Sequence, residues 1–195
     1  MASQVQMVNL ALLKFGNVSI QAISDSTPQA RFASVLWDIV RDELLSSYGW
    51  NFAMKQVILD TPSATTPDFK YDYKFTLPAD YLRVWDLYDC DLEYEVMGGE
   101  LYISTDEVNL EYIAKITDVS LWPSAFVRCM ATSLASELCL KMTGDDKRAS
   151  ALKMKLENID IPQAYKLNAI EGNKALHKNE QNLTKGNLEW QKEGR

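Results

Sequence analysis

The residues best suited to chemistry are five carboxylates that lie within ten positions of one another. They are Asp86, Asp89, Asp91, Glu93 and Glu95. Two carboxylates held close together can hydrolyse a glycosidic bond, one as general acid and the other as base or nucleophile. Strand alternation predicts Asp91, Glu93 and Glu95 on one face, where shielded like charges would raise one another's pKa. A solvated acidic face, channel-side or at a strand edge, is the interpretation that we favour.

Other catalytic and binding motifs are missing from the sequence. The single histidine, His177, lies in a polar stretch that offers a general base no shielded environment. The sequence contains no HExxH, no GxxxxGK[ST] or GxGxxG loop, and no GxSxG elbow. The three cysteines lack CxxC spacing and are predicted to be free thiols. We therefore predict no enzyme activity and no catalytic residue, cofactor or metal site.

The charge of the chain is unevenly distributed. The net charge is −7, and residues 51–119 carry 5 basic and 14 acidic side chains. No basic stripe of the kind that binds nucleic acid is visible along the sequence. An acidic middle suits a surface that DNA passes without sticking. With no apolar run of about 20 residues and no signal peptide, we expect no membrane contact and synthesis in the cytoplasm.

Helical spacing of apolar residues predicts four helices, two at each end of the chain. The first ends at Gly16, and Ser26-Thr27-Pro28 begins the second, which runs to about Tyr48. A third runs from Pro123 to Gly144, and a fourth continues to about Ile170 with a break at Pro162. In the second helix, Phe32, Val35, Leu36, Ile39 and Val40 are expected along one apolar side, and the polar face is Asp38, Arg41, Asp42 and Glu43. Trp37, Leu44 and Leu45 widen the apolar surface, so this helix is expected to pack against more than one neighbour. In the fourth, the expected buried stripe is Ala149, Leu152, Leu156 and Ile159.

Between these helices the period becomes two, which predicts strands. Phe69, Tyr71, Tyr73 and Phe75 are expected on the buried face of one strand. Further strands are predicted at 81–88, 92–97, 101–104 and 109–115, with Gly98-Gly99 as a hairpin turn. Short strands joined by hairpins indicate an antiparallel sheet or small sandwich.

The last 25 residues differ in composition from the rest. Residues 171–195 are polar, with a few large apolar side chains that include Leu183, Leu188 and Trp190. Such a segment is expected to be an arm that becomes ordered on a partner. The sequence thus predicts an α+β protein with one domain, residues 1–170. It comprises a mainly helical four-helix part, about 3–49 and 121–170, an inserted antiparallel β subdomain, about 51–119, and an extended C-terminal arm, 171–195.

The chain resembles the head-to-tail adaptor family of podoviruses, also called the tail tubular protein A family. The resemblance extends over essentially the whole chain and depends on the order and spacing of its motifs. They are Ala11-Leu12-Leu13-Lys14-Phe15-Gly16, Leu36-Trp37-Asp38-Ile39-Val40-Arg41-Asp42-Glu43-Leu44-Leu45, Trp50-Asn51-Phe52-Ala53, Tyr73-Lys74-Phe75-Thr76-Leu77-Pro78-Ala79-Asp80-Tyr81-Leu82-Arg83, and Tyr112-Ile113-Ala114-Lys115-Ile116-Thr117-Asp118. One departure is Tyr48-Gly49, where the family commonly has a His-Pro pair.

The resemblance implies a structural protein of the virion at the head–tail junction. Its partners would be identical copies in a dodecameric ring, the portal protein and the tail nozzle protein, with duplex DNA passing through unread. Leu183, Leu188 and Trp190 would then anchor the arm on the portal. Two other interpretations stay open: a virion-associated peptidoglycan hydrolase that uses the acidic strand, and a DNA-packaging regulatory subunit that binds duplex DNA.

Overall fold

The protein has an α+β fold, as the sequence predicts. The computed structural model describes residues 3–88 and 92–172. The helices are α1 (Gln4–Lys14), α2 (Pro28–Ser46), α3 (Ser124–Thr143), α4 (Asp146–Lys155) and α5 (Ile161–Gly172), with short turns η1 (Asn51–Ala53), η2 (Val119–Leu121) and η3 (Leu156–Asp160). The strands are β1 (Met54–Leu59), β2 (Tyr73–Thr76), β3 (Tyr81–Tyr88), β4 (Tyr94–Met97), β5 (Glu100–Ile103) and β6 (Val108–Ala114).

The helices begin and end at the residues that local chemistry favours. The Ser3 side chain accepts a hydrogen bond from the Gln6 amide in a capping box, and Thr27 caps α2 ahead of Pro28. Asp145 caps α4 by accepting from the Arg148 amide. Gly144 ends α3 in the left-handed conformation, with φ of 67°, where a side chain would be strained. The helix boundaries predicted at Thr27-Pro28 and Gly144 are confirmed.

Helix α3 is the centre of the helical part and contacts α1, α2, α4 and α5. It is buried on more than one side: Phe126, Cys129, Met130, Leu134 and Cys139 are all fully buried. The two cysteines among them are free, as predicted. A helix that is apolar on more than one side packs against more than one neighbour, and here four other helices contact it.

Helices α4 and α5 form one rod through the π-helical turn η3. The backbone N–H of Ile161 bonds to the Leu156 carbonyl, five residues back. Pro162 follows this turn. A proline has no N–H to donate, and its ring clashes with the preceding turn of a regular helix. The wider π-helical turn gives the ring the space that it needs. The extra residue changes which side chains face inward. Leu156, Asp160, Ala164 and Asn168 are buried, so the predicted burial of Ile159, which is 48% exposed, is wrong.

The strands form two antiparallel sheets of three strands each, in the orders β1-β6-β3 and β2-β5-β4. Gly98 and Gly99 join β4 to β5 with φ of 60° and 83°, which confirms the predicted hairpin turn. Phe75, Leu101 and Ile103 from one sheet and Leu87 and Leu110 from the other belong to one buried cluster, which also includes the helical core. The two sheets are therefore stabilised by a shared apolar interior.

Two strand predictions need correction. The strand expected over Phe69–Phe75 begins only at Tyr73, because Lys70 has a positive φ of 72° that interrupts an extended backbone. Phe69 is consequently 83% exposed, and Tyr73 is also exposed. The period-two pattern also failed to reveal β1, whose side chains alternate only weakly in hydrophobicity between Met54 and Leu59.

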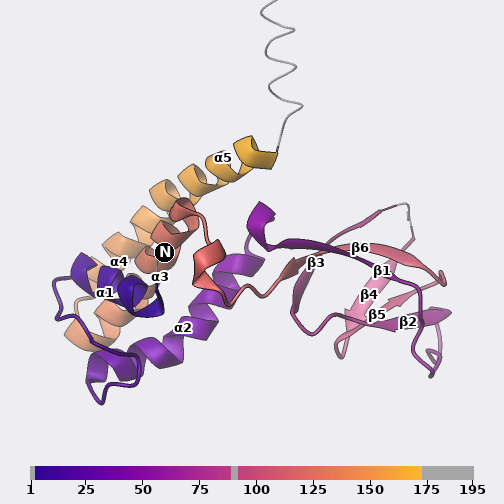
Figure 1. The fold of residues 1–195 in the computed structure, drawn as a ribbon, viewed down its shortest axis with the longest axis horizontal. Helices are drawn as coiled ribbons and strands as arrows, with labels where there is room; N and C mark the ends of the chain where they lie inside the picture. The colour runs from indigo at the N-terminus through magenta and orange to yellow at the C-terminus, as the bar shows by residue number, and fades with distance from the viewer. Residues whose placement is uncertain (1–2, 89–91, 173–195) are drawn as a thin grey trace, which may run out of the picture.

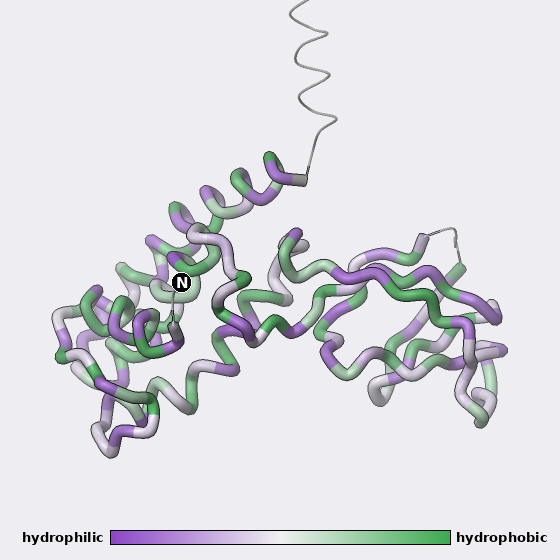
Figure 2. The backbone as a smooth tube through the Cα atoms, in the orientation of Figure 1, coloured by the Kyte–Doolittle hydropathy of each residue, from purple (hydrophilic) through white to green (hydrophobic). Residues whose placement is uncertain are grey.

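The helical part and the β part lie next to each other along the long axis of the molecule (Figure 1). The chain crosses between them twice, after α2 and before α3. The free end of α5 stands clear of both parts, and hydrophilic and hydrophobic residues alternate around it (Figure 2). The region where α2, η1, α5 and the strand ends meet is called the junction below.

Candidate functional site

The structure places few of the side chains that the sequence singles out for function. Asp91, together with Leu183, Leu188 and Trp190, lies outside the described residues. Glu93 is exposed and precedes β4, so it is not part of a strand. Glu95 lies on β4 and forms an ion pair with Lys70.

The electrostatics of Glu95 give the hydrolase interpretation no support. The hydrogen bond from Lys70 holds the pKa of Glu95 below its usual value, and the side chain is 44% exposed. A glycosidase general acid needs the opposite shift, because it must stay protonated near neutral pH. A solvated acidic surface is the better description of Glu95.

The acidic excess of the β part is not neutralised internally. Lys55, Lys70 and Lys74 each pair with one carboxylate, and Lys115 pairs with Asp42 on α2. Arg83 lies over the ring of Trp85. Four of the five basic side chains of residues 51–119 thus form ion pairs. Most of the acidic side chains that the structure describes in this range, which are those outside 89–91, form none.

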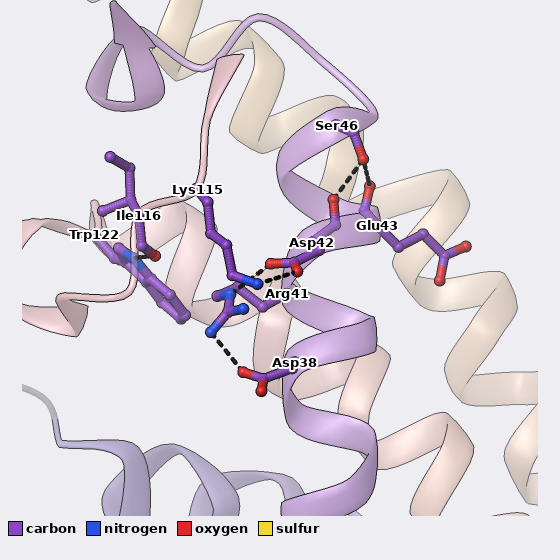
Figure 3. Close-up of polar contacts among 8 residues, drawn as sticks. All are labelled: Asp38, Arg41, Asp42, Glu43, Ser46, Lys115, Ile116 and Trp122. Carbon is purple, nitrogen blue, oxygen red and sulfur yellow. Dashed lines mark hydrogen bonds and ion pairs between the residues drawn. The ribbon is translucent and has the colours of Figure 1, made fainter. Parts of the chain in front are cut away.

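An ionic network at the junction joins α2 to the segment that follows β6 (Figure 3). Arg41 is only 3% exposed. It donates to Asp38 at 2.6 Å and to Asp42 at 2.7 Å, and Lys115 lies 2.9 Å from the second carboxylate of this pair. The expectation of an exposed polar face is therefore wrong for Arg41, whereas Asp38 and Glu43 on the same face are exposed.

Asp80 extends the junction to the sheet. Its carboxylate accepts hydrogen bonds from Lys55 at 2.5 Å and from the Tyr112 hydroxyl at 3.0 Å. Its backbone carbonyl accepts from the Lys115 amide at 2.6 Å. These contacts connect the start of β3 with β1 and β6. Arg41, Asp42, Asp80 and Lys115 each have a structural role at the junction.

A buried amide clamps α5 to the other side of the junction. Asn168 is 8% exposed. Its side-chain oxygen accepts from the Asn51 amide at 2.9 Å, and its side-chain nitrogen donates to the Gly49 carbonyl at 2.9 Å. One turn earlier, Tyr165 stacks on Tyr48 with ring centroids 3.9 Å apart. The direction in which α5 leaves the body is fixed by these contacts.

The outer side of α2 is apolar and exposed, contrary to expectation. Phe32, Val35 and Ile39 are 41%, 67% and 60% exposed, although their spacing predicts burial. The core side of the helix is Ala30, Ala33, Trp37, Val40, Leu44 and Leu45. Of the predicted side, Val40 is therefore buried as expected, and Leu36 is half-buried against the core. Trp37 stacks on Trp122, which places the core side of α2 against the body.

Exposed α2 residues continue into a groove of about 370 Å³ between α2, α3 and the α4–η3 rod. Leu36 and Ile39 line it on one side and Leu156 and Ile161 on the other. Its charged residues are Glu43, Glu137, Lys153 and Glu157. We call this surface the acidic flank.

A second groove, of about 550 Å³, lies between α1, α3 and the rod. Leu10, Val127 and Ile159 are its apolar residues. Its charged residues are Lys14, Arg128, Lys155 and Asp160. Asp160 is buried and accepts from the Thr132 hydroxyl at 2.7 Å. We call this surface the basic flank.

The basic flank corrects the expectation that the chain has no basic patch. Lys14, Arg128 and Lys155 come from three helices that are far apart in the sequence, so no local charge run could reveal them. Burial lowers the pKa of Lys14, and the neighbouring charges of Lys155 and Arg128 lower it further, whereas Asp160 opposes this shift. Within the described residues, none of the three cations forms an ion pair.

The fold and these surfaces define an α+β protein with charged, partly apolar flanks. No protein-family model matches the chain, and neither does any curated protein. Residues 3–88 and 92–172 contain no group of three or more His, Cys, Asp or Glu side chains that could hold a metal ion. Over the same residues, no helix has both the length and the hydrophobicity that crossing a bilayer requires.

Proposed function

We propose that this protein is a head-to-tail adaptor of a short-tailed bacteriophage, a structural component of the virion at the head–tail junction. Residues 1–170 act as one adaptor domain, a four-helix part with a β insertion, and residues 171–195 act as its arm. The partners are identical copies in a ring, the portal protein and the tail nozzle protein. Duplex DNA passes through the ring without sequence-specific binding.

The observation that carries the proposal is that the junction holds the C-terminal end of α5 and the β part apart from each other (Figure 1). The network of Arg41 and the clamp of Asn168 hold α5 and the β part in a fixed relation. The C-terminal end of α5 stands clear of the body (Figure 1). A protein that joins two larger assemblies needs this kind of geometry.

Charge and motif order support the same function. The β part keeps a large acidic excess, which repels DNA and suits the neighbourhood of a DNA channel. Several stretches that resemble the adaptor family converge at the junction, where Arg41, Asn51, Asp80 and Lys115 hold the parts together. These stretches, which are far apart in the sequence, thus contribute to the same junction.

The test is binding of the full chain to the portal ring of the same virus, measured by co-sedimentation. We expect wild-type protein to co-sediment and a chain truncated after residue 170 to lose binding while retaining its circular dichroism. Leu188→Ala with Trp190→Ala should weaken binding in the same way, because apolar anchors dominate such contacts. Leu183→Ala tests the third proposed anchor. Absence of wild-type binding to both portal and nozzle protein would overturn the proposal.

A further inference from the structure

We propose that the acidic flank of one copy binds the basic flank of the next copy, so that identical chains associate head-to-tail. The inference rests on the proposed function, since it names the surfaces through which copies of the adaptor contact one another. It concerns the subunit interface alone, and its test is independent of the portal.

The two flanks lie on opposite faces of the same pair of helices. Arg128 and Glu137 are nine positions apart on α3, which is about two and a half helical turns. Lys155 immediately precedes the π-helical turn and lines the basic groove, whereas Glu157 lies within this turn and lines the acidic groove. Helix α1 borders only the basic flank and α2 only the acidic flank. Both flanks of one copy can therefore be occupied at the same time.

The charges of the two flanks are complementary. The acidic flank has three carboxylates and one lysine, and the basic flank has three cations and one carboxylate, which is already bonded to Thr132. Within the described residues, Glu43, Glu137 and Glu157 form no ion pair, like the three cations opposite. Each flank thus supplies the counter-charges that the other lacks.

The basic flank has more cations than its one carboxylate can neutralise. Burial lowers the pKa of Lys14, and the charges of Lys155 and Arg128 lower it further, while Asp160 acts in the opposite direction. Ser124, at the start of the 20-residue helix α3, also lines this groove, and no side chain caps that helix. The positive end of a helix adds to the attraction for carboxylates.

Apolar contacts would accompany the charges. Ile39 on the acidic flank is 60% exposed, and Leu10 and Ile159 on the basic flank are 41% and 48% exposed. Apolar residues surrounded by charges are typical of protein interfaces, where burial provides affinity and charges provide orientation. The apolar stripe of Phe32 and Val35 extends the acidic flank along α2.

Two different complementary surfaces on one chain define a heterologous contact. Such a contact does not produce a closed symmetric dimer but repeats from copy to copy, and it yields a ring when the rotation closes. Self-association through these flanks accordingly gives the ring that an adaptor requires, with one flank of each copy facing each neighbour.

The experiment uses full-length variants in which one flank is reversed in charge. Lys14→Glu with Lys155→Glu makes both flanks acidic, and Glu137→Lys with Glu157→Lys makes both basic. Sedimentation velocity over a concentration series, with and without the portal ring, measures the association of copies. We expect each variant alone to associate at least about tenfold more weakly than wild type, because like charges then face each other.

Mixing the two variants is the decisive step. One variant has two acidic flanks and the other has two basic flanks, so each can bind only the other variant on both sides. An equimolar mixture should therefore recover multimers in which the two variants alternate, and only rings with an even number of copies should close. Matched controls carry the same charge changes away from the flanks: Lys147→Glu with Lys166→Glu, and Asp106→Lys with Glu107→Lys, all at exposed positions. Circular dichroism checks that every variant is folded.

Three results would overturn the inference. They are unchanged association of the reversed variants, failure of the folded variants to recover on mixing, and a wild type that forms no multimer either free or on the portal. Binding of duplex DNA to wild-type monomers that is lost with Lys14→Glu and Lys155→Glu would assign the basic flank to nucleic acid instead. Multimers that form but bind neither the portal protein nor the tail nozzle protein would count against the adaptor function, while the proposed interface between copies would still be supported.

Discussion

Asn168 on α5 and Asn51 at the start of the β part bond to each other through both side chain and backbone. The Asn51 amide donates to the Asn168 side chain, and the Asn51 side chain donates to the Asn168 carbonyl at 2.7 Å. The two residues are 117 positions apart. Their contact therefore attaches α5 to the segment that links α2 with the β part.

Asn168→Ala should lower the free energy of unfolding by about 2–4 kcal/mol, because it leaves the Asn51 amide and the Gly49 carbonyl without their buried partners. Urea unfolding followed by circular dichroism measures the change. Asn158→Ala is the matched control, since Asn158 is exposed on the same rod and donates only to the Met154 carbonyl of its own helix. Equal effects of the two substitutions would contradict the clamp.

Gly49→Ala should also destabilise the junction, by about 1–3 kcal/mol. A Cβ at this position would lie 2.6 Å from the ring of Trp85, closer than any ordinary contact. Trp85→Leu removes that ring, so the cost of Gly49→Ala should shrink in its background. A double-mutant cycle in urea measures the coupling. Additive effects would show that Trp85 does not impose the glycine.

The Asp42 carboxylate should make the protein sensitive to acid. Burial opposes its ionisation, but hydrogen bonds from Arg41 and Lys115 outweigh burial and hold its pKa below the usual value of 3.8. A pKa that is lower in the folded state contributes stability above the unfolded value, and this stability is lost as the pH falls through the folded value. The stability difference between wild type and Asp42→Asn should therefore be constant near neutrality and shrink below about pH 4. Glu43→Gln, which removes one carboxylate at the exposed neighbouring position, is the matched control.

The Cys129 thiol should be unreactive in the folded protein. Burial, followed by the nearby charge of Asp160, raises its pKa to about 12. Because the thiolate is the nucleophile, iodoacetamide at pH 8 should leave Cys129 unmodified in native protein and modify it in guanidinium chloride. Peptide mass spectrometry separates it from the other cysteines. Rapid native modification of Cys129 would show that α3 is accessible to solvent.

Local chemistry was sufficient to predict much of the fold. Thr27-Pro28, Gly144 and Gly98-Gly99 each predicted an element boundary correctly, because caps and turns depend on residues close in sequence. The pattern of α2 was misread, since both of its sides are apolar and periodicity alone does not decide which one faces the core. The failure at Ile159 has a different cause, a π-helical turn that shifts every later residue around the helix axis.

The candidate surfaces could not be predicted in the same way. Lys14, Arg128 and Lys155 converge only after three helices have packed, and Glu43 and Glu137 meet Glu157 across a groove in the same manner. The helical spacing of Phe32, Val35 and Ile39 was the one sign of an apolar surface in the sequence. It was interpreted as part of the core, but all three side chains are exposed. Position in the fold, rather than residue type, separates a buried stripe from an interface.

The clamp at Asn168 has a consequence for any cyclic assembly of this chain. Rotational symmetry would give α5 the same direction in every subunit, so all the C-terminal segments would begin on the same side of the assembly. Once some segments had bound a partner, the effective concentration of the remaining segments near their sites would rise, even if each contact alone were weak. Tight attachment could arise from avidity, with no single arm needing high affinity.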